Sequence, residues 1–318
     1  MRITKPSYAQ FLCEIRRKAK HLKVDFVVED TLVYNTKDGR TLTYPYVRIS
    51  SPDLSRPTLL IRATIHGDEY AGALTILRHL TRIFRYADRE GISLVVFPLD
   101  NPSGYDNNQR YNIENDHGNG GNNDFLRYLL PFGRLTGEIK KGTKFQSWYW
   151  ASDSRCKCRL PKETRALHQA LKRISLGNVK GVLDIHQDKY QVSPITYFYG
   201  YGNTDVYAPI VRKVERCLPI PRNTDLNSPK IATEDYINEV VKSGKVEVGE
   251  GSMRTDRNGC VVYHDGSLPD LFWRLGADHA ITVETPTTTS FEKCDEINMV
   301  WILGVIRLIS KGVSARTK

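Results

Sequence analysis

Hydrophobic and polar positions follow two different spacings along the chain. Residues 57–65 form a dense run of aliphatic and β-branched side chains, typical of a strand that is covered on both faces. From residue 68 to 85 apolar side chains recur every three or four positions, which predicts a helix with one buried stripe. Both patterns return further along the chain, so the sequence predicts an α/β protein.

The same spacings predict most of the other elements. Helices are expected at 7–22, 162–174, 205–217, 234–242, 268–275 and 297–309, and strands at 24–29, 31–35, 42–49, 92–98, 180–187, 194–201 and 280–284. Residues 37–40 read as a hairpin turn, which would place the early strands at a sheet edge. Residues 100–160 are rich in Asn and Gly, and their pattern assigns no regular structure to them; a long irregular stretch inside a compact domain is often a binding loop.

A histidine and a glutamate stand where the first buried strand meets its helix. His66 and Glu69 are three residues apart, with Gly67 allowing the backbone to bend between them. Open α/β sheets bind their ligands at such strand ends. A catalytic zinc site needs a third protein ligand and an open position, and the next buried strand pattern ends in His186. Taken singly, His66 could cap a helix and His186 could be a core histidine; together with Glu69, they favour a metal site.

These residues resemble a known family. His66-x-x-Glu69, followed much later by Asp184-Ile185-His186, is similar to the zinc-binding set of the M14 family of metallocarboxypeptidases, including its bacterial muropeptide amidases. The succinylglutamate desuccinylase and aspartoacylase group shares this ligand pattern more distantly. The resemblance implies one zinc ion and a three-layer α/β/α fold around a central twisted mixed β-sheet.

Two arginine motifs extend the resemblance. Asn101-Pro102-x-Gly104 followed by Arg110-Tyr111-Asn112 is similar to the segment that delivers the family's catalytic arginine. The resemblance therefore implies a catalytic Arg110, with Asn112 in substrate binding. Asp124-Phe125-Leu126-Arg127 stands where the family has Asp-x-Asn-Arg, so Leu126 replaces the asparagine. The resemblance implies that Arg127 binds a substrate carboxylate. The alternative is that both arginines are solvated loop cations.

A tyrosine and a glutamate complete the predicted site. Glu284 ends an apolar strand about twenty residues after Tyr263, in the order that the family gives to a mobile tyrosine and its catalytic glutamate. The resemblance implies that Glu284 takes a proton from a zinc-activated water and passes it to the leaving amine, while Tyr263 closes over the substrate. Alternatively, Glu284 caps the next loop. Most tyrosines of 194–201 are expected to pack, with one or two walling a pocket.

Composition and the distribution of apolar runs bear on the number of domains and on where the protein is located. The 318 residues are 40% hydrophobic, with no low-complexity linker, so we expect a single catalytic domain over 1–318. The first 50 residues have no family counterpart that we can name. No signal peptide or membrane-spanning run is evident, which predicts a cytoplasmic protein. The basic helix at 7–22 could lie on a membrane, but packing on its own sheet is the commoner case.

Neither the net charge nor the cysteines indicate a further partner or a disulfide framework. The formal charge of +10 could indicate an acidic partner, but the basic residues are spread along the chain without a nucleic-acid motif, so we expect a solvated surface and no nucleic-acid partner. The six cysteines have irregular spacing and read as reduced thiols.

These observations favour a zinc carboxypeptidase or amidase that cleaves a C-terminal amide bond of a peptide or muropeptide. One alternative is an N-acyl amino acid hydrolase of the desuccinylase and aspartoacylase type. Another is a binding protein for an anionic polymer on a peptidase fold that no longer catalyses.

Overall fold

The computed structural model describes residues 5–116, 118, 122–139, 142–191, 193–226 and 253–316, with the backbone alone for 313–316. The helix predicted at 234–242 lies outside these residues. Most of the other predicted helices and strands are present within a few residues of their expected bounds.

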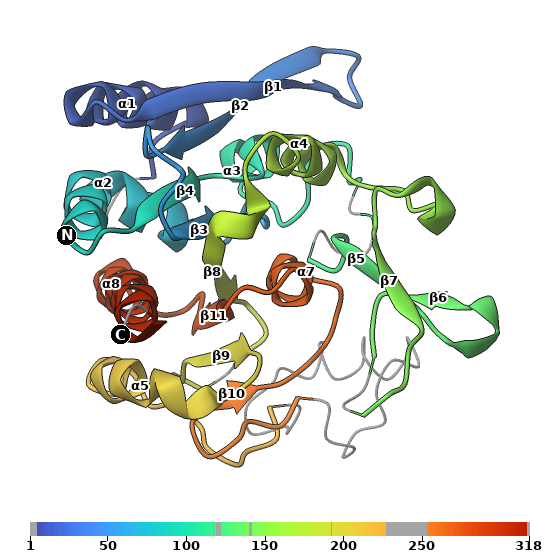
Figure 1. Ribbon diagram of the computed structural model, residues 1–318. Coiled ribbons are helices and arrows are strands. Elements are labelled where there is room, and N and C mark those ends of the chain that lie inside the picture. The colour runs from blue at the N-terminus through green and yellow to red at the C-terminus, as the bar shows by residue number, and fades with distance from the viewer. Residues whose placement is uncertain are drawn as a thin grey trace.

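A large mixed sheet organises the described part of the chain (Figure 1). Its eight strands are β1 (Asp25–Asn35), β2 (Thr41–Ser50), β3 (Thr58–Ala63), β4 (Ser93–Phe97), β8 (Val179–Asp188), β9 (Tyr197–Gly200), β10 (Cys260–Val261) and β11 (His279–Pro286), in the order β1-β2-β4-β3-β8-β11-β9-β10. The pairs β4–β3, β3–β8 and β8–β11 are parallel, whereas β11–β9 and the β1–β2–β4 edge are antiparallel.

Helices cover both faces of this sheet. The described helices are α1 (Tyr8–Leu22), α2 (Ala71–Arg89), α3 (Pro102–Asn107), α4 (Lys162–Leu171), α5 (Ala208–Val214), α7 (Leu268–Arg274) and α8 (Phe291–Arg316). Figure 1 shows α2, α8 and α5 along one face, with α4 and α7 on the other. The predicted three-layer α/β/α class with a central mixed sheet is confirmed.

The middle strands bring the site together. Every residue of β3 and β4 is buried, as their apolar sequences require for strands covered on both faces. Because β3, β8 and β11 run parallel, their carboxyl ends meet at one edge of the sheet. Ala63 pairs with Ile185, and Glu284 pairs with His186. The residues that follow β3 and those that end β8 and β11 are therefore neighbours.

The amphipathic helix α1 packs on the rest of the fold. Ser7 caps it by accepting a hydrogen bond from Gln10 N, and Ser7 N in turn donates to Gln10 Oε1. Its apolar stripe, including Phe11 and Ile15, is buried in the main hydrophobic cluster. Of the two readings of its sequence, packing on its own fold is therefore the one that the structure supports.

Two predictions of local structure were wrong. The two strands expected at 24–29 and 31–35 form one strand, β1, with an irregular register between Val28 and Asp30. The side chain of the residue between them, Glu29, is buried and bound by Arg48 and Arg173. The final helix starts at Phe291, earlier than expected.

The region 100–160, to which the sequence pattern assigned no elements, contains regular structure. It holds α3 and a small antiparallel sheet of β6 (Leu135–Thr136), β5 (Leu126–Leu129) and β7 (Ser147–Trp150), ordered β6-β5-β7. Strands of two to four residues are too short to show a period of two. They pair with one another, β5 with β6 and β5 with β7, and a local hydrophobic pattern does not record this pairing.

Candidate metal centre and cleft

The turn after β3 places the first two candidate ligands. Thr64 has φ 60°, a left-handed conformation that β-branched residues rarely adopt, and it is fully buried. Its hydroxyl donates to Glu69 O at 3.1 Å, which ties the strand end to the start of the helix. This strained residue turns the chain so that His66 and Glu69 face the same side.

Two glycines let a second segment approach this turn. A Cβ at Gly67 would lie 2.1 Å from the carbonyl carbon of Gly104, and one at Gly104 would lie 2.6 Å from Asn101 Nδ2. Gly67 N donates to Arg110 O at 3.0 Å, and Asn101 Nδ2 donates to the same oxygen at 3.2 Å. The Asn-Pro-x-Gly motif thus holds Arg110 against the turn that carries His66 and Glu69.

Three buried side chains converge at the end of β8. One candidate ligand atom from each of His66, Glu69 and His186 lies within 4.8 Å of the others. His66 Nδ1 is 2.7 Å from Glu69 Oε1, and His186 Nδ1 is 3.0 Å from Glu69 Oε2. Two imidazoles and one carboxylate are a donor set that binds zinc at catalytic sites. The residues therefore fit a divalent metal ion.

The charges around this cluster are balanced by burial and by neighbours. Burial lowers the pKa of His66 to about 4, which favours the neutral ring that a metal requires. Burial alone would raise the pKa of Glu69, but His66 and Arg110 hold it well below its usual value. Burial would lower the pKa of His186, but Asp184 and Glu69 raise it well above its usual value.

A second carboxylate orients His186. Asp184 Oδ2 lies 3.2 Å from His186 Nε2, on the side opposite the nitrogen that faces Glu69. Arg62 binds both oxygens of Asp184, with Nε 3.0 Å from Oδ1, and is fully buried. Metal-binding histidines are commonly oriented by a carboxylate in this way.

Glu284 and Arg110 flank the three ligands. Glu284 lies beside His186 on the neighbouring strand and lines the cleft. Burial raises the pKa of Glu284 well above its usual value, and the negative charges of Glu69 and Asp188 add to the shift. Arg110 Nη1 is 2.5 Å from Glu69 Oε1. A carboxyl that holds its proton more tightly and a fixed guanidinium are the groups that general base catalysis and oxyanion stabilisation need.

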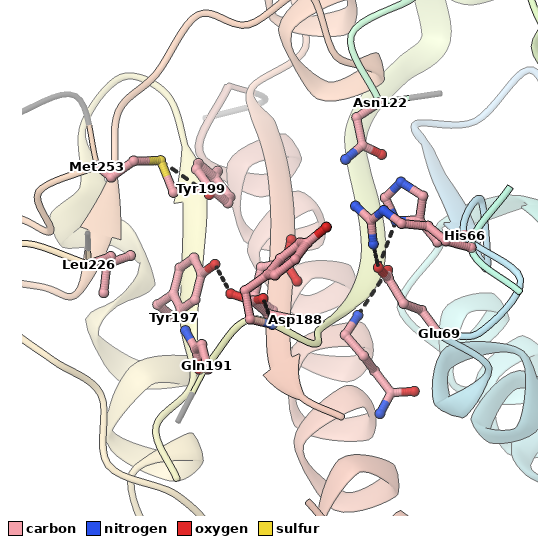
Figure 2. Close-up of a pocket in the computed structure, with 13 residues that line it drawn as sticks. His66, Glu69, Asn122, Asp188, Gln191, Tyr197, Tyr199, Leu226 and Met253 are labelled. Carbon is pink, nitrogen blue, oxygen red and sulfur yellow. Dashed lines mark hydrogen bonds and ion pairs between the residues drawn. The ribbon is translucent and has the colours of Figure 1, made fainter. Parts of the chain in front are cut away.

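A cleft of about 640 Å³, counted with its open mouth, lies over these groups. Figure 2 shows His66 and Glu69 on one side and Tyr197, Tyr199, Gln191, Leu226 and Met253 on the other. Asp188 lies beside Tyr197 and is joined to it by a hydrogen bond. The two tyrosines confirm that the aromatic strand contributes to a pocket wall.

Three predicted substrate-binding residues do not line this cleft among the described residues. Arg127 is buried, and its guanidinium donates to the carbonyl oxygens of Asn123 and Leu126 and lies 3.2 Å from an oxygen of Asp124. Asn112 is buried and donates to Glu163 and to Asp116 O. Tyr263 donates to Glu138 Oε2 at 2.7 Å. Their roles in substrate binding stay predictions.

Several cleft residues were not identified from the sequence. They are Asn122, Gln187, Asp188, Tyr190, Gln191, Leu226 and Met253. Position alone could have indicated some of them, because Gln187 and Asp188 directly follow His186 at the end of its strand. Leu226 and Met253 give no such signal, since the fold brings them to the cleft from the far end of the sheet.

The fold is that of metallocarboxypeptidases. A protein provisionally named a metallopeptidase from Shewanella baltica superposes with a TM-score of 0.60 at 18% identity, covering 93% of this chain and 91% of its own. A metallo-carboxypeptidase from Burkholderia cenocepacia gives 0.55 at 13%, covering 96% and 68%. Bovine thrombin-activatable fibrinolysis inhibitor, in complex with a tick carboxypeptidase inhibitor, gives 0.56 at 13%, covering 98% of each chain.

Sequence comparison adds a local match. Residues 55–125 match the succinylglutamate desuccinylase/aspartoacylase catalytic domain. No curated protein is significantly similar in sequence. With the fold, this match makes the chain a protein similar to the M14 and desuccinylase/aspartoacylase group, as the motifs predicted. The fold and the His-Glu-His cluster support a metal-dependent hydrolase. No helix in the described ranges has the length and apolar character to cross a bilayer.

Proposed function

We propose that the protein is a zinc-dependent hydrolase that cleaves a C-terminal amide bond of a peptide or muropeptide. The observation that carries the proposal is the convergence of His66, Glu69 and His186 beside Glu284 and Arg110 in one cleft. These residues come from three parallel strand ends and one loop, which is how α/β hydrolases of this fold assemble a site. All five positions being filled argues against a protein that only binds.

Each residue has a defined task in this proposal. His66, Glu69 and His186 would hold the ion, which when bound supplies a Lewis acid and lowers the pKa of a coordinated water towards roughly 7. Glu284 accepts a proton from the attacking water and delivers it to the leaving nitrogen. Arg110 stabilises the negative charge that develops on the carbonyl oxygen. Asp184 keeps His186 oriented.

Arg127, Asn112 and Tyr263 complete the proposed substrate site on the strength of their motifs. Arg127 would bind a substrate carboxylate in two-pronged fashion. Its guanidinium is held by Asp124 and two backbone carbonyls, so this role requires it to exchange those partners. Tyr263 would likewise have to leave Glu138 to reach a bound chain.

A second candidate is hydrolysis of an N-acyl amino acid. The match of residues 55–125 to the desuccinylase/aspartoacylase catalytic domain favours it, because that segment includes both His66 and Glu69. The two candidates share the same metal and base and differ in substrate.

Metal analysis and a substrate panel test the proposal. We expect the purified protein to hold one zinc ion per chain and to hydrolyse a member of a panel of C-terminal peptides and muropeptides. Preference for acyl amino acids in the same panel would support the second candidate. A protein with no stoichiometric metal and no hydrolysis, but with affinity for an anionic polymer, would replace both with a binding function.

A further inference from the structure

One wall of the cleft has a carboxyl group that the proposed chemistry does not use. Among the described residues, the carboxyl groups that line the cleft are Glu69, Asp188 and Glu284. Glu69 belongs to the metal cluster and Glu284 is the proposed base. Asp188 has no ion-pair partner within 4.0 Å among the described residues. Its oxygens accept hydrogen bonds from Tyr190 N at 2.7 Å and Tyr197 OH at 2.9 Å.

The same wall carries an amide that no other described residue completes. Gln191 is 5% exposed and lines the cleft, and within the described part of the chain neither its Nε2 nor its Oε1 is hydrogen-bonded. Figure 2 shows it next to Tyr197 on the side of the cleft away from His66. A buried polar group without a partner is costly, so such a group in a cleft points to a ligand or water that completes it.

No described cation forms a direct ion pair with Asp188. Burial raises the pKa of Asp188, and the charge of Arg110 acts on it from across the cleft and opposes that shift. Arg110 is the one permanently charged cation among the described cleft-lining residues, and it is bound to Glu69. The remaining surface is aromatic or apolar, made by Tyr190, Tyr197 and Tyr199 with Leu226 and Met253. A carboxylate and a free amide above such a surface suit a cation on an aliphatic stem, because the rings cover the stem and can also face the charge.

From this arrangement we infer that the substrate residue lying against this wall carries an amino group on its side chain, as in lysine or another diamino acid. Asp188 accepts its charge, Gln191 hydrogen-bonds the adjoining polar group, and the tyrosines pack on the methylenes. A substrate residue with an acidic side chain is disfavoured there by Asp188. The inference rests on the proposed function, since it assumes that the cleft binds a peptide.

Lysine and norleucine make a matched pair of probes, since they share an aliphatic stem and differ by the ammonium group. Peptide pairs would carry one or the other on either side of the scissile bond, with a third set carrying glutamate. We expect the parent enzyme to hydrolyse the best lysine peptide at least about tenfold more efficiently, by kcat/KM, than its norleucine partner, and the glutamate peptide least of all. Equal or better hydrolysis of norleucine would overturn the inference.

Substitutions assign the preference to the wall. Asp188→Asn should bring the lysine-to-norleucine ratio close to one, and Asp188→Glu should retain part of it. Gln191→Leu should weaken binding of the lysine peptide. Asp205→Asn, which removes an exposed carboxylate paired with Arg257, should leave the ratio unchanged. A parent-like ratio in Asp188→Asn would remove the wall from the explanation, and thermal unfolding would verify that each variant is folded.

Binding separates this inference from the proposed function. Calorimetry with the same peptides and the Glu284→Gln protein measures the preference without hydrolysis. If the parent protein cleaves no peptide but the Glu284→Gln protein binds lysine peptides at least tenfold more tightly than norleucine peptides, the wall inference stands and the proposed reaction fails. If the parent protein cleaves peptides and neither protein shows this preference, the proposed reaction stands and the wall inference fails.

Discussion

The two sides of the cleft differ in how far their polar groups are already paired. On the metal side, His66, Glu69 and His186 contact one another, and Asp184 and Arg62 hold them from behind. On the facing wall, Gln191 has no hydrogen-bond partner and Asp188 has no ion-pair partner among the residues that the structure describes. Fixed geometry suits groups that must act at the reacting bond, whereas unpaired groups suit recognition, since a substrate can complete them.

The largest expected effect comes from the proposed general base. Glu284→Gln should lower kcat by about two to four orders of magnitude, because the amide cannot accept a proton from water. Zinc content should stay at the parent level, since Glu284 is not one of the three ligands. Single-turnover hydrolysis and metal analysis of the same sample check both points. Parent-like hydrolysis would remove Glu284 as the base.

The two arginines give the next comparison. Arg110→Met should lower kcat/KM by about a hundredfold or more, because it removes a donor to the developing oxyanion. The loss of thermal stability should be smaller than in Arg127→Met, since Arg110 lies at the cleft whereas Arg127 is buried. Hydrolysis of the best peptide and a thermal unfolding curve measure the two effects.

Arg127→Met is the matched variant of a buried arginine. It leaves Asp124 and two carbonyl oxygens without their donor, so we expect a large loss of thermal stability. Comparing free and amidated C-termini tests the carboxylate role. If Arg127→Lys raises KM only for peptides with a free C-terminus, the guanidinium binds the substrate carboxylate. If KM rises equally for free and amidated peptides, Arg127 has a structural role.

A smaller effect, on zinc affinity, is expected from Asp184, which contacts the ligand His186. Asp184→Asn should weaken zinc affinity by about 10- to 100-fold, because it weakens the orientation of His186. Competition with a chelator measures this without relying on activity. Asp295→Asn is the control, since Asp295 binds His79 away from the cleft and its loss should leave zinc affinity unchanged. Equal zinc affinity in the two variants would show that Asp184 has no part in holding the metal.

The sequence was informative where function lies at the ends of long, regular elements. His66, Glu69, His186 and Glu284 each stand at the end of a buried strand or on the turn that follows it, so a pattern of apolar residues located them. Asp188 and Gln191 were missed because nothing in their local sequence shows which way they face. Arg127 shows the opposite limit: its motif was visible, but the burial of its guanidinium depends on Asn123 and Asp124 folding around it.

The smallest expected effect concerns the buried charges that support the metal side. Burial raises the pKa of Asp100 to about 7, although Arg62 and Tyr46 oppose the shift. An unfolded aspartate loses its proton near pH 4, so between about pH 4 and pH 7 the folded chain binds the extra proton and the free energy of unfolding falls as pH rises. Asp100→Asn should flatten that decline, with zinc affinity unchanged.

Denaturant unfolding of both proteins from about pH 5 to pH 8 measures the slope. An unchanged slope in Asp100→Asn would mean that Asp100 is already ionised in the folded chain at the lower pH. Arg62 would then share its charge between two carboxylates, Asp100 at 3.6 Å and Asp184, rather than serve Asp184 alone. In that case Asp184 would be held less firmly than its contacts suggest, and the contrast between a fixed metal side and an open wall would be weaker.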